Sequence, residues 1–351
     1  MLSGQLLRTL RATSSNLNFF NPKYPQLAAL TLPVYKSYCT SSIFHKKIRE
    51  ACDNYSPIGV FALLKDGNRL KSVLDEINQG VIGNYLHNHF ISGLNAYAHQ
   101  NFSFCTGFLE GDVPLEAICR SFIQFCSANK MYLDPAKTLD SFERHNQLSD
   151  EAVKYELKKI TPKVELNLLG FGLDTGYYEQ ELARYLVASH KAEKVNIFGF
   201  DPYANPNRAI RYLSVDELNS GQWTFDLIVA RWVLHHVAMN YRWDDFVNCI
   251  NRCNPGAEVL IVEHGFLAEA SLFDRRVSAL FNAVFDIVAN IGLRPDYFFK
   301  GSALGEKFFI HYLEPKDFSK IASHVSVKVG LNIYDVGPVF PNQSICKMTK
   351  K

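Results

Sequence analysis

Residues 224–237 read TFDLIVARWVLHHV, and this stretch decides the fold class. Apart from Asp226, the segment Phe225–Ala230 is apolar, and it has the length and composition of a strand that is buried on both faces. Polar and aromatic side chains follow at Arg231-Trp232 and at His235-His236. A nearly continuous apolar run is typical of the interior of a parallel sheet, and ligands bind where the strands of such a sheet end.

Short apolar runs of the same kind lie on both sides of this stretch, separated by helical segments or turns. Strands are expected at Val164–Leu169, Val195–Phe200, Ile210–Leu213 and Glu258–Glu263, with closing strands around Val325–Val336 and Ser344–Met348. Helices are expected at Arg242–Cys253 and Ala268–Ile291. Strands that alternate with helices predict an α/β fold with a parallel sheet.

Two of the expected strands end in residues suited to a nucleoside ligand. The first runs into Gly170-Phe171-Gly172-Leu173-Asp174, whose glycines let the backbone approach a ligand closely. The second ends in Asp201-Pro202, where a carboxylate can accept hydrogen bonds from both ribose hydroxyls. A dinucleotide-binding turn has the same spacing, and Asp201 is alternatively a plain turn residue, so these two elements do not choose between cofactors.

The ordered set of motifs resembles the class I S-adenosylmethionine-dependent methyltransferases. The likeness includes the glycine turn, the acid at the second strand, the Phe-Asp and Leu-His-His parts of residues 224–237, and the turn Asn254–Ala257 before the fifth strand. It covers residues 164–351. The resemblance implies a Rossmann-like seven-stranded sheet in the order 3-2-1-4-5-7-6, with the last strand antiparallel.

The resemblance also implies the cofactor, S-adenosylmethionine, and its contacts. Its methionine moiety is expected near Gly170 and Gly172, its ribose at Asp201, and its adenine near Asp216. Alternatively, Ser214–Leu218 is an N-capped helical turn, which leaves the role of Asp216 open. The expected cofactor residues are Gly170, Phe171, Gly172, Asp174, Asp201, Pro202, Asp216, Arg231 and Trp232.

Two departures from the family pattern bear on activity. Leu168 stands where an acidic residue usually precedes the first glycine, which favours a catalytically silent protein. Only about eight residues separate Asp201 from the third strand, so the usual helix between them is short or missing.

Histidine can act as a general base because it titrates near neutral pH. His236 and His264 are the candidate catalytic residues, and His235 and His311 are further candidates; each is alternatively a structural histidine. No metal site is predicted, because the eight cysteines form no CxxC pair and have no zinc-site spacing. Cys249 and Cys253 would share one face of a helix, and all cysteines are expected to be reduced.

Residues 1–49 contain seven basic residues and no acidic one, and they are rich in serine. This composition predicts a mitochondrial transit peptide; a disordered basic arm is the alternative. Without these residues the chain holds 30 basic and 35 acidic residues, a net charge of −5, and a cut near Tyr38 leaves 33 and 35, a net charge of −2. A domain of this sign has no bulk attraction for nucleic acid.

The rest of the chain divides into residues 50–162, which are helical, and residues 163–351, the methyltransferase domain with a helical insertion at residues 268–305. A helical stripe runs from Leu70 to Leu86. Both helical parts are expected to wall the substrate pocket. No apolar stretch is long enough to predict a membrane span, since residues 227–239 are broken by Arg231 and two histidines.

The expected function is transfer of a methyl group from S-adenosylmethionine to an acceptor, foremost a small molecule, with a protein substrate also open. The alternatives are a catalytically silent assembly factor, an RNA or protein methyltransferase in mitochondria, and an NAD(P)-dependent oxidoreductase. No hydride-transfer constellation supports the last. Oligomeric state is left open by the sequence.

Overall fold

The computed structural model describes residues 43–78, 84–145, 151–173, 175–201, 210–236, 244–264, 271–293, 327–334 and 343–350. The predictions made for Asp174, Pro202, His311 and residues 1–42 lie outside the described residues.

The sheet has seven strands in the order β3-β2-β1-β4-β5-β7-β6. Strands β1 to β5 run parallel, and β7 is antiparallel to both β5 and β6. Their bounds are β1 Lys163–Phe171, β2 Ala192–Phe200, β3 Arg211–Tyr212, β4 Phe225–Arg231, β5 Cys253–His264, β6 Val327–Tyr334 and β7 Gln343–Lys350. This is the order implied by the resemblance, so the class I methyltransferase fold is confirmed.

Helices cover both faces of this sheet, and the buried residues of its central strands β1 and β4 are mostly apolar. On one face, Phe171 and Ile228 pack with Phe246 of α13 (Asp244–Asn251). On the other, Leu168 and Val229 pack with helices α10 (Glu151–Leu157) and α11 (Tyr177–Ala188). A fully buried aliphatic or aromatic side chain contributes about 1.5–3 kcal/mol to stability, so β4 stabilises the sheet through both faces.

The helix expected at Arg242–Cys253 is shorter than predicted. It ends at Asn251, and Cys253 is already the first residue of β5, paired with Phe225. The extended backbone can start this early because the register with β4 shifts after Phe225. The prediction that Cys249 and Cys253 share a helix face is therefore wrong. The cysteines of the described residues are free and buried.

A second, helical unit packs around α14 (Leu272–Leu293). Its other members are α3 Ile43–Ala51, α4 Pro57–Lys65, α5 Gly67–Asn78, α6 Asn84–Gln100, α7 Phe102–Glu110, α8 Leu115–Ala128 and α9 Pro135–His145. Phe281 and Phe285 of α14 contact Phe90 of α6, and one apolar core joins α14 to the earlier helices. The region before the sheet and the helix after β5 therefore form one core, although the sequence separates them.

Local signals fix where several of these helices begin and end. Ser56 accepts a hydrogen bond from the Gly59 amide at the start of α4, which also has Pro57 in its first turn. Gly111 adopts a left-handed conformation and ends α7. The apolar stripe expected from Leu70 to Leu86 belongs to two helices, because α5 ends at Asn78 and α6 begins at Asn84.

Helix α3 lies inside the segment that was expected to be a transit peptide or a disordered arm. Phe44 and Ile48 are buried in the helical core, and Arg49 pairs with Asp274 at 2.6 Å. Residues 43–49 therefore belong to the folded helical unit. The folded part of the chain begins at or before Ile43, and not after residue 49 as predicted.

Within the described residues, α14 is the one helix long and apolar enough to cross a membrane. Its most apolar window is 78% buried inside the protein, as expected of a core helix.

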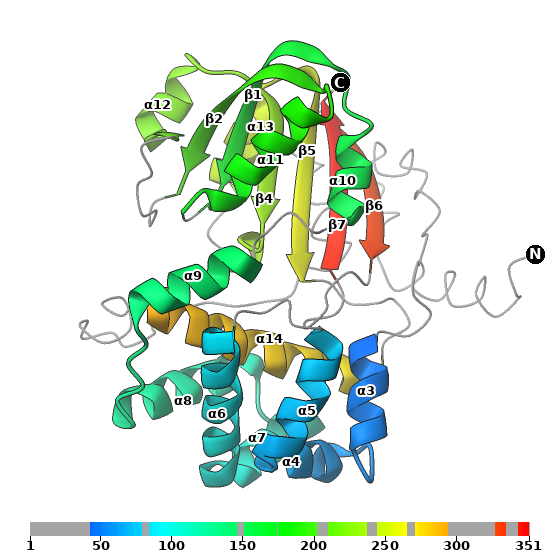
Figure 1. Cartoon of the computed structure of the whole chain (residues 1–351), viewed down its shortest axis with the longest axis vertical. Helices are drawn as coiled ribbons and strands as arrows, with labels where there is room; N and C mark the ends of the chain where they lie inside the picture. Colours follow the sequence, from blue (N-terminus) through cyan, green and yellow to red (C-terminus); the bar gives the residue numbers. More distant parts are fainter. Residues whose placement is uncertain are drawn as a thin grey trace, which may run out of the picture.

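The helical unit lies against the carboxyl ends of the parallel strands, with α14 and α9 nearest to the sheet (Figure 1). His235, in the turn after β4, reaches Asp286 of α14 at 3.3 Å. The edge of the sheet where class I methyltransferases bind ligands thus faces helices.

Candidate functional site

The turn after β1 is built so that only glycine fits at residue 172. Gly172 has a φ of +67°, and an added Cβ would lie 2.0 Å from Cγ2 of Val233. Its amide donates a hydrogen bond to the Phe200 carbonyl at 2.8 Å. The turn therefore lies against the ends of both neighbouring strands, β2 and β4, and offers a close backbone approach.

A buried carboxylate lies beside the first glycine of this turn. Glu179, in the first turn of α11, is 3% exposed. A Cβ added to Gly170 would lie 2.8 Å from its Cγ and 3.0 Å from its Cδ. Glu179 was not among the predicted site residues; its sequence signal is an acid in the first turn of the helix that follows the glycines.

Asp201 is half-buried and directly follows β2, whose last residue, Phe200, pairs with Phe171 of β1. The predicted ribose acid is thus brought to the same edge of the sheet as the glycine turn. Its role as the ribose ligand stays a prediction.

Asp216 is exposed in the first turn of a short helix, α12 (Val215–Ser220). Ser214 and Glu217 form a capping box: the Glu217 amide donates to Oγ of Ser214 at 3.1 Å, and the Ser214 amide donates to the Glu217 carboxylate at 2.9 Å. The N-capped helical turn named as the alternative is therefore what the structure contains. The adenine role of Asp216 stays a prediction.

At the end of β4, a cation is stacked between two aromatic rings. The Arg231 guanidinium lies 4.1 Å from the ring centroid of Tyr178 and 3.7 Å from that of Trp232. Trp232 has a φ of +52°, uncommon for a bulky residue, and its amide donates to the Val262 carbonyl at 2.8 Å. Backbone strain of this kind concentrates at functional sites. Here it occurs at Trp232, which with Arg231 is one of two predicted cofactor residues at the end of β4.

His235 is fully buried between two carboxylates. Its Nδ1 lies 2.6 Å from Oε2 of Glu263 at the end of β5, and its Nε2 lies 3.3 Å from Oδ2 of Asp286. Burial alone would lower the pKa of His235, but the two carboxylates outweigh it and raise the pKa to about 10. An imidazole with its pKa raised in this way is favoured in its protonated form between the two carboxylates, so His235 is poorly suited to act as a general base in this arrangement.

His236 and His264, the two candidate catalytic histidines, lie near the ends of neighbouring strands of the sheet, β4 and β5. His236 is half-buried, and its ring centroid lies 4.1 Å from that of His235. His264 is the last residue of β5, and the structure describes its backbone but not its side chain. Only His236 is thus placed by its side chain at the site, and the catalytic role of both stays a prediction.

Asp226, the acid of the Phe-Asp pair, lies at the start of β4, away from this edge. It is 7% exposed and accepts hydrogen bonds from Lys163 at 2.6 Å, from the Asn167 amide at 2.9 Å and from Asn254 at 2.7 Å. These contacts join β1, β4 and the start of β5. Asp226 stabilises the sheet and belongs to no ligand site.

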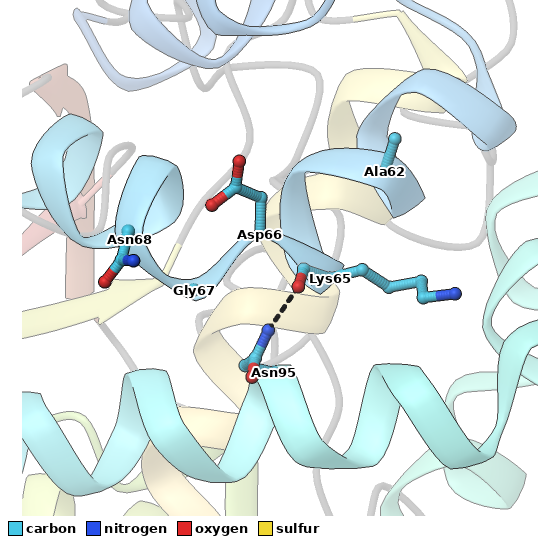
Figure 2. A pocket seen from close by; sticks show the side chains of 6 residues that line it. All are labelled: Ala62, Lys65, Asp66, Gly67, Asn68 and Asn95. Carbon is cyan, nitrogen blue, oxygen red and sulfur yellow. Dashed lines mark hydrogen bonds between the residues drawn. The ribbon is translucent and has the colours of Figure 1, made fainter.

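A polar hollow in the helical unit is unrelated to this site. Ala62, Lys65, Asp66, Gly67, Asn68 and Asn95 line it (Figure 2). Asn95 donates to the Lys65 carbonyl at 2.6 Å, and Asp66 accepts from the Arg69 amide at 3.1 Å. These side chains satisfy the end of α4 and the start of α5, which accounts for their polarity without a ligand.

Several solved methyltransferases are similar to this chain at low identity. The CurJ carbon methyltransferase is 13% identical, with 88% of this chain and 90% of that chain covered and a TM-score of 0.38. Human N-acetylserotonin methyltransferase with bound SAM is 15% identical, with coverage of 74% and 70% and a TM-score of 0.40. Magnesium protoporphyrin IX methyltransferase from Synechocystis with bound SAM is 10% identical, with coverage of 57% and 77% and a TM-score of 0.32.

No family model matches the sequence, and no curated protein matches it. The fold assignment therefore rests on the strand order of the sheet.

Proposed function

We propose that this chain binds S-adenosylmethionine and transfers its methyl group to a small molecule. The observation that carries the proposal is the sheet order β3-β2-β1-β4-β5-β7-β6 with Gly172, Asp201 and Arg231 at the ends of neighbouring strands. In open α/β sheets, ligands bind outside the carboxyl ends of the strands, where the strand order reverses. That reversal lies between β1 and β4, next to the glycine turn.

The residues at this edge fit the charges of the cofactor. S-adenosylmethionine carries an amino-acid group with one ammonium and one carboxylate. Glu179, beside Gly170, would bind the ammonium, and the guanidinium of Arg231 would bind the carboxylate. Strand β1 has no acid at the position where the family usually has one, since that residue is Leu168 and lies in the apolar core. In this proposal Glu179 takes the place of the missing carboxylate.

When bound, the cofactor supplies a sulfonium methyl group, which a nucleophile displaces in line as the carbon–sulfur bond breaks. The contribution of this chain is to hold and orient the two partners and to exclude water. An acceptor that loses a proton needs a base, and in the metal-free protein His236, whose ring lies beside that of His235, would be the candidate.

The placement of the helices supports a small acceptor. Helix α14 lies against the strand ends (Figure 1), and the contact between His235 and Asp286 joins it to the turn after β4. A covered edge favours an acceptor that is enclosed on binding over a folded protein or an RNA duplex.

Calorimetric titration with S-adenosylmethionine and with its demethylated product tests the proposal. We expect both ligands to bind, and Glu179→Gln and Arg231→Met each to weaken binding about 10-fold through loss of one charge-assisted contact. The matched control is Glu181→Gln, which removes an acid from the same helix that pairs with Arg184. Binding of NAD(H) without binding of either ligand would instead support the oxidoreductase alternative.

A second candidate function is a catalytically silent assembly factor that retains the fold. The burial of Leu168, where the family usually has an acid, is the observation that favours it. Cofactor binding without methyl transfer to any of a panel of small hydroxyl, amine and carbon acceptors would support this function.

We place the protein in mitochondria because residues before α3 are basic and contain no acid. Since α3 begins at Ile43, removal of a transit peptide should occur before this helix. N-terminal sequencing of the protein from mitochondria should find a start upstream of residue 43, and an intact Met1 form in the cytosol would contradict the proposal.

A further inference from the structure

Three side chains that can bind a metal converge where the sheet meets α14. They are His235, His236 and Asp286, and their candidate ligand atoms all lie within 4.8 Å of one another. The two histidines follow β4 in a 3-10 turn, Leu234–His236, and Asp286 comes from the middle of α14. The sequence hides this set, because 50 positions separate Asp286 from His236.

Two of these atoms already have the spacing that one ion requires. Nε2 of His235 and Oδ2 of Asp286 are 3.3 Å apart. Ligand atoms held at about 2.0–2.2 Å from an ion such as Zn²⁺ lie about 3.0–3.5 Å from each other. His236 is half-buried, so its ring can turn the remaining distance without disturbing the core.

Glu263 gives His235 the orientation of a metal ligand. It lies 2.6 Å from Nδ1 of the imidazole, and its other oxygen accepts the amides of Val233 and Leu234 at 2.8 and 2.6 Å. A metal-binding histidine nearly always donates its second ring N–H to a carboxylate or carbonyl, which fixes the tautomer. With Nδ1–H directed at Glu263, a metal ion that displaces the proton of Nε2 would be bound by this nitrogen on the side of Asp286.

The position of Asp286 also needs a reason beyond packing. It is the one charged residue in the apolar segment Val277–Ile291, and its side chain is 15% exposed. A carboxylate inside an apolar helix costs stability unless charge and hydrogen bonds compensate it. An imidazolium at His235 or a bound cation would supply that charge.

We propose that His235, His236 and Asp286 form a binding site for a divalent first-row transition ion. Two imidazoles and one carboxylate suit Zn²⁺, Fe²⁺ or Co²⁺, and three protein ligands leave coordination positions open. The site joins the end of β4 to α14, so the ion would fix the helical unit against the sheet. Its open positions would take an oxygen-bearing ligand such as a hydroxyl or carboxylate group.

The test uses the full chain, stripped with a chelator and titrated with Zn²⁺ in a calorimeter. We expect one ion per chain, and His236→Asn and Asp286→Asn each to weaken binding at least about 10-fold. Glu263→Gln, which removes the carboxylate that orients His235, should weaken it by about 10- to 100-fold in the fraction of the protein that is folded. Co²⁺ should give visible absorption bands in the wild type that both ligand variants lose.

The matched control is His87→Asn in α6. His87 is also buried and lies 3.1 Å from a carboxylate, that of Asp75 in α5, but it is not one of the three residues of the cluster. This variant should bind Zn²⁺ as the wild type does. Thermal unfolding of each variant shows that it is folded, and Asp286→Asn keeps the shape of the side chain if a histidine variant fails to fold.

The proposal is overturned if the wild type binds no stoichiometric Zn²⁺ at micromolar concentration, or if both ligand variants bind it unchanged. Either result would leave His235 as a structural imidazolium between two carboxylates. Metal binding is measured without the methyl donor, and binding of the methyl donor is measured on stripped protein. The two proposals can therefore fail separately.

Discussion

Nδ1 of His235 lies 2.6 Å from Oε2 of Glu263, and both side chains are fully buried. Glu263 is at the end of β5, and His235 is in the turn that follows β4. Because the same carboxylate also accepts the Val233 and Leu234 amides, it holds the whole turn that borders the glycine turn at Gly172. The shape of the proposed cofactor site thus depends on one buried acid.

Glu263→Gln should destabilise the protein strongly. The amide keeps an oxygen for the backbone donors but removes the charge opposite His235, and breaking a buried ion pair costs about 3–5 kcal/mol. The measurement is urea unfolding of both proteins. Glu165→Gln is the control, because Glu165 pairs with Lys194 on the exposed surface of the sheet and its loss should change stability little. Equal effects of the two substitutions would contradict the structural role of Glu263.

Asp226→Asn should reduce stability without affecting cofactor binding. Charge-assisted hydrogen bonds contribute about 1.5–3 kcal/mol each, and the amide retains only part of those made with Lys163, Asn167 and Asn254. Chemical unfolding should therefore show a loss of about 1.5–3 kcal/mol. A titration with S-adenosylmethionine should be unchanged, because Asp226 lies at the opposite end of β4 from the site.

The contribution of Asp226 should also depend on pH. Burial alone would raise its pKa, but the hydrogen bonds from Asn167, Lys163 and Asn254 outweigh burial and hold the pKa below its usual range. The ionised form is thus favoured in the folded protein. The stability difference between wild type and Asp226→Asn should be full above the unfolded pKa of about 3.9 and should shrink as pH falls through the lower folded value. A difference that grows on acidification would contradict this assignment.

The sheet could be predicted because its signals are local. Leu227–Ala230 is an unbroken apolar run, and Gly170 and Gly172 lie at the end of the strand that contains Leu166, Leu168 and Leu169. The metal-ligand cluster could not be predicted, because His236 and Asp286 meet only through the packing of α14 against the sheet. Cys253 was assigned to a helix because the register shift that lets β5 begin there has no sequence signature.

Gly172→Ala should damage both stability and cofactor binding. The left-handed backbone at residue 172 costs an alanine about 1–2 kcal/mol, and its Cβ would also overlap Val233. The double variant Gly172→Ala with Val233→Ala removes the overlap and keeps the backbone strain. The double variant should therefore have a melting temperature above that of Gly172→Ala and below that of the wild type. The effect of Val233→Ala alone is measured separately and subtracted. If the double variant is no more stable than Gly172→Ala, the contact with Val233 does not limit this position.

Asp201→Ala tests the ribose assignment most directly, because the assignment gives the Asp201 side chain a single role, binding of the ribose. A carboxylate at the end of β2 can accept two hydrogen bonds from a ribose diol, and charge-assisted hydrogen bonds contribute about 1.5–3 kcal/mol each. Loss of one such bond should weaken binding of S-adenosylmethionine by about 10- to 100-fold. Asp201→Asn keeps one acceptor, and its affinity should fall between those of the wild type and the alanine variant.

Asp216→Ala is the control: loss of this exposed acid in α12 should change the affinity less. The measurement is a calorimetric titration of each variant, with circular dichroism to show that it is folded. Wild-type affinity in Asp201→Ala would mean that the ribose is held elsewhere.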